Sequence, residues 1–127
     1  MEASELRIGN LVNARKTYHN WDATCLITGL THKGIYVKYG NGHIIPINIK
    51  PILLTEEWLL KFGGIHETGG MYFFGNVGIL HYRRENEFSL MNYNYKKGQI
   101  YTTIKYVHQL QNLYFALTGK ELEYEQN

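Results

Sequence analysis

The stretch KYVHQLQNLYFALTG at residues 105–119 decides the fold, because it carries the clearest helical pattern in the chain. At 100° per residue its core-facing side chains fall within an arc of about 60°. We expect a helix over 105–118 that turns this arc into the core and ends at Gly119, with Leu122 folding back beyond it. The members of the arc are Tyr106, Leu110, Leu113 and Leu117, with Val107 and Tyr114 at its edge.

The opposite side of this helix carries one large apolar residue, Phe115, about 180° from Tyr106. Its helical neighbours are His108, Gln111 and Asn112. A Phe among polar groups indicates a second contact, because an apolar side chain gains by leaving water. We interpret these four residues as a contact interface with another molecule, or alternatively as packing against the amino-terminal half.

The rest of the chain predicts an α+β fold, mostly antiparallel β, in a single domain over 1–127. Residues 5–54 predict a small, bent, SH3-like barrel half, in which Pro46 marks 43–49 as an edge strand. Residues 55–63 predict a short helix with Thr55 as its N-cap. A β meander is expected over 70–104, and GGIHETGG at 63–70 is a plausible hinge.

Composition excludes several classes of protein. The chain has 127 residues, of which 44% are hydrophobic and 19% charged, with a net charge of +2. A disordered chain, a coiled coil and a membrane span are excluded by these values. The single cysteine, Cys25, and an acidic start without an apolar signal core predict a cytoplasmic location.

The sequence has few residues in the arrangements that catalysis or metal binding requires. The six histidines lack metal-ligand spacing, and Asp22 is the only aspartate. Neither serine lies in a nucleophile elbow, and Cys25 sits in a β-prone run that predicts burial. Glu56 and Glu57 are interpreted as ordinary carboxylates at a helix start. We expect no enzyme activity, no metal and no cofactor.

Nucleic-acid or nucleotide binding is the strongest alternative function. Exposed aromatic rings beside cations can stack on bases and neutralise phosphates. The residues that carry this prediction are Arg83, Arg84, Tyr93, Tyr95, Lys96 and Lys97. The competing interpretation is that Met91, Tyr93 and Tyr95 form one packed sheet face and the two lysines solubilise a hairpin tip.

Three blocks of the chain resemble a family of small phage, prophage and mobile-element proteins of gut anaerobes. They are LRIGNLV at 6–12, LTEEWLLKFG at 54–63 and YVHQLQNLYFALTGKEL at 106–122. After LLKFG this chain has Gly64, whereas the sequences of that family have Phe. The path of the chain after the short helix can therefore differ from theirs. The resemblance implies a phage-like context, where small proteins bind and modulate host components, and it brings no site residue.

Taken together, these patterns predict a non-enzymatic binding or adaptor protein. The expected partner is a protein, either a second copy of the chain or a host component, and no membrane is expected. The predicted contact is the Phe115 side of the final helix. Binding of nucleic acid, or of a nucleotide held at a subunit interface, is the alternative.

Overall fold

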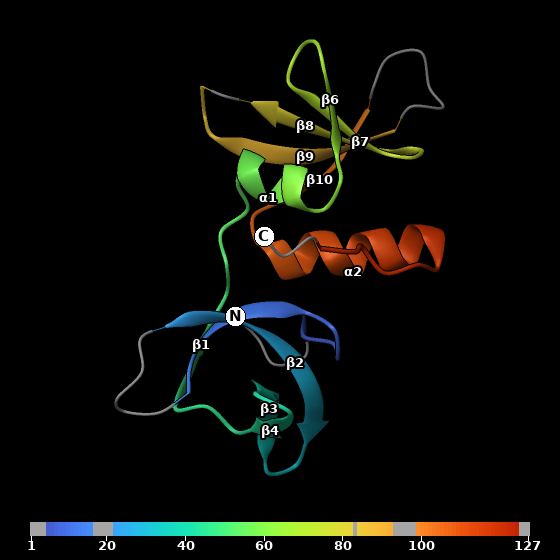
Figure 1. Ribbon diagram of the computed structural model, residues 1–127. Helices are drawn as coiled ribbons and strands as arrows, with labels where there is room; N and C mark the ends of the chain where they lie inside the picture. The colour runs from blue at the N-terminus through green and yellow to red at the C-terminus, as the bar shows by residue number, and fades with distance from the viewer. Residues whose placement is uncertain (1–4, 17–21, 83, 93–98, 125–127) are drawn as a thin grey trace. The chain divides into compact units, whose positions relative to one another are not determined.

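The computed structural model describes residues 5–16, 22–82, 84–92 and 99–124. It is an α+β fold built from two antiparallel five-stranded sheets and two helices (Figure 1). The chain divides into two compact units. Unit 1 comprises Met1–Ile52 and Tyr106–Asn112, and unit 2 comprises Leu53–Lys105 and Leu113–Asn127.

Unit 1 holds a sheet with the strand order β4-β3-β2-β1-β5. Its strands are β1 (Leu11–Arg15), β2 (Ala23–Thr31), β3 (Gly34–Tyr39), β4 (Gly42–Ile44) and β5 (Asn48–Lys50). The single strand predicted over 43–49 is wrong, because β4 and β5 are separate and lie at opposite edges of the sheet. Pro46, between them, has no amide hydrogen to donate to a strand ladder, which accounts for the break.

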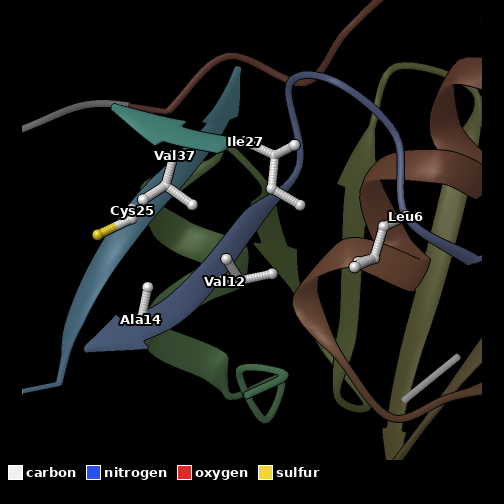
Figure 2. Packing of buried hydrophobic residues seen from close by; sticks show 6 residues of the cluster. All are labelled: Leu6, Val12, Ala14, Cys25, Ile27 and Val37. Carbon is white, nitrogen blue, oxygen red and sulfur yellow. The ribbon is translucent and has the colours of Figure 1, made fainter. Parts of the chain in front are cut away.

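The core of unit 1 comes from the inward positions of β1, β2 and β3. Figure 2 shows Val12 and Ala14 of β1 facing Cys25 and Ile27 of β2, with Val37 of β3 beside them. Leu6, which precedes β1, belongs to the same cluster. The predicted burial of Cys25 is confirmed. Burial raises the pKa of its thiol, against a smaller opposing effect of Lys16, so the thiol stays protonated at neutral pH.

Unit 2 holds the second sheet, with the order β10-β9-β8-β7-β6. Its strands are β6 (Ile65–Glu67), β7 (Met71–Phe74), β8 (Val77–Tyr82), β9 (Glu87–Asn92) and β10 (Gln99–Ile104). The predicted meander is confirmed by the antiparallel pairing of β7 with β8, β8 with β9 and β9 with β10. The predicted hinge at 63–70 contains edge strand β6, which pairs antiparallel with β7 from Ile65↔Phe73 to Glu67↔Met71.

Helix α1 (Glu56–Lys61) forms where the sequence predicts it. The Thr55 hydroxyl accepts a hydrogen bond from the Trp58 amide at 3.3 Å, which satisfies one of the unpaired amides of the first turn. Leu59 is buried, and the Trp58 ring stacks on Tyr124 at 5.5 Å. Gly63 follows with a φ of +83°, a conformation that glycine adopts without strain.

Helix α2 (Val107–Thr118) contributes residues to both units. The predicted helix and its stop at Gly119 (φ +74°) are confirmed, and Leu122 is buried. The predicted core arc is partly wrong: Leu117 is 55% exposed, whereas His108 and Gln111 are buried. Within the described ranges, neither helix has the length and apolar character needed to cross a membrane.

Two neighbouring glycines between β6 and β7 provide a test of the sheet in unit 2. Gly69 and Gly70 have φ values of +79° and +78°, so alanine strains the backbone equally at both, by about 1–2 kcal/mol. Only at Gly70 does an added Cβ meet backbone, the His81 carbonyl oxygen at 2.7 Å. We expect Gly70→Ala to lower the free energy of unfolding more than Gly69→Ala, measured by chemical denaturation. Equal losses would contradict the close approach of Gly70 to β8.

Candidate functional site

The predicted interface residues Gln111 and Asn112 bind the chain's own amino-terminal segment. The Gln111 side chain accepts a hydrogen bond from the Leu11 amide at 2.8 Å and donates one to the Gly9 carbonyl at 3.1 Å. These bonds supply a buried amide and a neighbouring carbonyl with the partners that such groups require. Gln111 is only 2% exposed, so its assignment to an intermolecular surface is wrong.

Asn112 extends this network with both ends of its amide. Its Oδ1 accepts hydrogen bonds from Arg7 Nε at 2.9 Å and from Asn10 Nδ2 at 2.8 Å, and its Nδ2 donates to the Glu5 carbonyl at 2.7 Å. We name the contacts of Gln111 and Asn112 with residues 5–11 the amide clamp. Both amides satisfy backbone or side-chain groups of the same unit, so the clamp is structural.

His108 is also buried in unit 1, with no exposed surface. Its Nε2 lies 3.8 Å from a Glu5 carboxylate oxygen, beyond hydrogen-bonding distance, and within the described part of the chain neither ring nitrogen has a hydrogen-bond partner. Burial lowers the pKa of His108 below 6.5, and the attraction of Glu5 opposes this only in part. The assignment of His108 to a contact surface is therefore wrong as well.

Phe115 is the remaining member of the predicted interface, and it lies at the surface. It is 40% exposed, and all four residues from 115 to 118 are exposed. Leu117 in the same turn is 55% exposed. We name residues 115–118 the α2 end. Beside it, in the same unit, a hollow of about 580 Å³ is lined in part by Phe74, Tyr114 and Leu122.

A chain of polar side chains in unit 2 was not expected from the sequence. The Tyr72 hydroxyl donates to Glu56 Oε2 at 2.8 Å, and Glu56 Oε1 lies 2.8 Å from His81 Nδ1. The other ring nitrogen of His81 lies 3.1 Å from Asn86 Oδ1. The sequence offers no signal for this arrangement, because Glu56 and Glu57 look alike as carboxylates in the first turn of a helix.

The His81 ring is fixed on all sides. It stacks on Phe88 with the centroids 4.3 Å apart and the planes 7° apart, and its side chain is 7% exposed. His81 Nδ1 approaches Glu56 Oε1 without the alignment of a hydrogen bond. Asn86 is held at a φ of +52°, a left-handed conformation that Asn tolerates better than most residues. Both ring nitrogens therefore face protein oxygens, and the arrangement ties α1 to β8.

A groove of about 550 Å³ opens next to this cluster. Asn86 and Phe88, which both contact His81, form part of its lining together with Leu53, Thr55 and Ile104. Ligand pockets of such a size usually combine an apolar lining with a few convergent polar groups. Here the His81 ring is shielded from the groove by its own contacts, so the geometry favours a packing role over acid–base chemistry.

The structure describes one of the six residues predicted to bind nucleic acid. Arg84 is exposed, after β8. The other five, Arg83, Tyr93, Tyr95, Lys96 and Lys97, lie outside the described residues. As for metal ligands, the described ranges contain no group of three His, Cys, Asp or Glu side chains that could hold an ion.

The chain matches no protein-family model, no curated protein and no solved structure.

The contacts of Glu56 with Tyr72 and His81 predict that two adjacent carboxylates, Glu56 and Glu57, differ in their effect on stability. Glu56→Ala and Glu57→Ala each remove a charge from the first turn of α1, but only Glu56 holds Tyr72 and His81. We expect Glu56→Ala to lower the free energy of unfolding by about 1–2 kcal/mol more than Glu57→Ala, because it removes the carboxylate that accepts the hydrogen bond of the buried Tyr72 hydroxyl. Hydrogen exchange of the β7 and β8 amides measures the loss of stability in each variant. Equal protection in the two variants would contradict the role given to Glu56.

His108 predicts a pH dependence of stability. Because its folded pKa is lowered, the folded chain binds the proton less readily than the unfolded chain. Stability is therefore complete above a pH of about 6.5 and falls as the pH drops below this value toward the lowered pKa. His108→Leu removes this slope, whereas His32→Leu, at an exposed turn position, retains it. Denaturation between a pH of about 7 and about 5 checks this, and an unchanged slope in His108→Leu would contradict it.

Proposed function

We propose that this chain is a non-enzymatic binding protein that contacts a partner protein through the α2 end. The observation that carries the proposal is the exposure of two large apolar residues, Phe115 at 40% and Leu117 at 55%, within one helical turn. Apolar side chains gathered on one exposed turn mark contact sites, because binding removes them from water. Aromatic residues in particular dominate the binding energy of interfaces.

The hollow beside the α2 end supports the same function. Tyr114 precedes Phe115 and lines the hollow together with Phe74, whose ring lies 6.3 Å from that of Tyr114 in an edge-on arrangement. Lys120 and Glu121 add charged groups to the lining. A side chain of the partner can enter this hollow while Phe115 and Leu117 contact the surface around it. Interfaces commonly combine such an apolar centre with a polar rim.

The polar cluster in unit 2 favours binding over catalysis. A general base needs a nitrogen or oxygen within reach of the substrate proton. Both nitrogens of His81 face Glu56 and Asn86 instead, and the ring is covered by Phe88. The resemblance to phage and prophage proteins leads us to propose a host protein as the partner, in the cytoplasm, with modulation of that protein as the role.

A second candidate function is nucleic-acid binding. Exposed Arg84 is the described member of the residues predicted for it. The observation that favours this candidate is the distribution of charge: the sequence of unit 1 has six Lys and Arg against three acidic residues. Unit 2 has seven against eight, so the basic surplus of the chain belongs to unit 1. Positive surplus on one unit attracts phosphates.

The α2 end is tested with two leucines of unit 2 that are equally exposed, Leu117 on α2 and Leu60 on α1, both at 55%. We expect Phe115→Asp and Leu117→Asp to weaken partner binding at least about tenfold, because a buried carboxylate without a counter-charge is costly. Leu60→Asp should bind like the unchanged chain. Sedimentation first measures self-association, and titration of a host protein captured by the unchanged chain then measures binding between different proteins.

Three outcomes would overturn the proposal: equal losses in Leu60→Asp and Leu117→Asp, no loss in Phe115→Asp, or unfolding of Phe115→Asp. The last would show that Phe115 belongs to the core. Self-association that is lost in both α2 variants would support the α2 end and identify a second copy as the partner.

A further inference from the structure

The outward face of the β3–β4 hairpin in unit 1 carries aromatic and basic side chains together. Val37 and Ile44 are paired across the hairpin and pack inward, so the alternating positions face outward. Lys38 pairs directly with His43 on that outward face, and both are exposed. Tyr36 lies two residues before Lys38 and shares this face. We name Tyr36, Lys38 and His43 the hairpin face (Figure 1, β3 and β4).

Tyr36 is held in a fixed position by its neighbours. It pairs with Gly29 of β2, and a Cβ built on Gly29 would lie 3.5 Å from Cβ and Cδ2 of Tyr36. The Tyr36 side chain therefore covers the backbone where β2 has no side chain of its own. The His43 ring meets it edge-on, with the centroids 5.5 Å apart. Tyr36 is partly exposed, so part of this positioned residue faces solvent.

The lysines of unit 1 differ in their charged neighbours. Lys50 pairs with Asp22 at 3.7 Å. Within the described ranges, neither Lys33, which precedes β3, nor Lys38 has a carboxylate partner. Lys16 lies over the Tyr39 ring at 5.2 Å from its centroid, which is a cation–π contact. The charge surplus of unit 1 is therefore accompanied by aromatic rings on the same hairpin.

We propose that the hairpin face binds single-stranded nucleic acid, with a base stacked on Tyr36 and the flanking phosphates neutralised by Lys38 and Lys33. The proposal rests on the second candidate function and is independent of the α2 end. It moves the predicted chemistry from the Arg83–Lys97 region to a different sheet. The face offers no set of amide or guanidinium groups that would read one base, so binding should tolerate any sequence.

Single strands fit this face better than the other anionic partners. Sheet faces that carry aromatic rings stack unpaired bases, and each stacked base contributes substantially whatever its identity. A duplex keeps its bases paired and offers a sheet only its backbone and grooves. An acidic protein or an anionic membrane would use the lysines alone, and neither would need Tyr36.

The test is fluorescence anisotropy of the full chain with a labelled oligothymidine of about 15 nucleotides, a length that covers one binding module. Salt is varied from about 50 mM to about 200 mM. The logarithm of the affinity should fall with the logarithm of salt by about 0.7 for each phosphate contacted. Lys38→Ala should weaken binding and reduce the slope by one such step. Tyr36→Leu should weaken binding about tenfold and leave the slope unchanged.

Two controls separate stacking from charge. Lys50→Ala removes the same charge from the same unit at the opposite edge of the sheet, and should weaken binding less than Lys38→Ala. An abasic oligonucleotide of equal length keeps the phosphates and lacks the bases. The unchanged chain should bind it about tenfold more weakly than oligothymidine. Because the abasic comparison uses the unchanged chain, it holds even if Tyr36→Leu fails to fold.

Each remaining outcome is decisive. The abasic strand could bind as tightly as oligothymidine, or polyglutamate could do so. Either result would overturn stacking on Tyr36 and leave only attraction of polyanions. Preference for a duplex of equal length would overturn the single-strand assignment. Oligothymidine binding that is unaffected by Tyr36→Leu and Lys38→Ala would overturn the hairpin face while retaining nucleic-acid binding. No binding at the lowest salt would overturn both.

Discussion

The amide clamp is the interaction on which the organisation of unit 1 depends. Gln111 and Asn112 are neighbours on α2, and together they bind a segment about 100 positions earlier in the chain through Gly9, Leu11 and Glu5. Ordering that segment costs conformational entropy. The hydrogen bonds made by the oxygen and the nitrogen of each side-chain amide offset part of this cost. The segment leads directly into β1, whose side chains Val12 and Ala14 form the core with β2 and β3.

The two units use buried histidine differently, and the difference bears on function. His108 has no hydrogen-bond partner on either nitrogen within the described residues, and burial keeps it neutral. His81 lies between a carboxylate, an asparagine and an aromatic ring, and it links α1 to β8 and β9. Neither ring is presented to a ligand. The α2 end and the hairpin face, in contrast, both include exposed side chains.

Part of the candidate site could be predicted from the sequence. The exposure of Phe115 followed from its position opposite Tyr106 on the helical wheel. The basic aromatic surface that the sequence predicts around Arg84 stays a prediction, and the hairpin face lies on another sheet. Tyr36, Lys38 and His43 are unremarkable in the sequence, and only the pairing of Lys38 with His43 and of Tyr36 with Gly29 brings them together. The Glu56 contacts were equally invisible, because they join residues from three different elements.

The sequence by itself determined the local elements. Alternating apolar residues, glycine turns, the Thr55 cap and the Gly119 stop each act over a few neighbouring residues, so they fix strands and helices without distant partners. Which side of α2 is buried was decided only by the tertiary structure. Periodicity alone assigns Gln111 to water and Leu117 to the core. Gln111 is buried because residues 9–11 supply hydrogen bonds to its amide, and a side chain so satisfied loses little by leaving water.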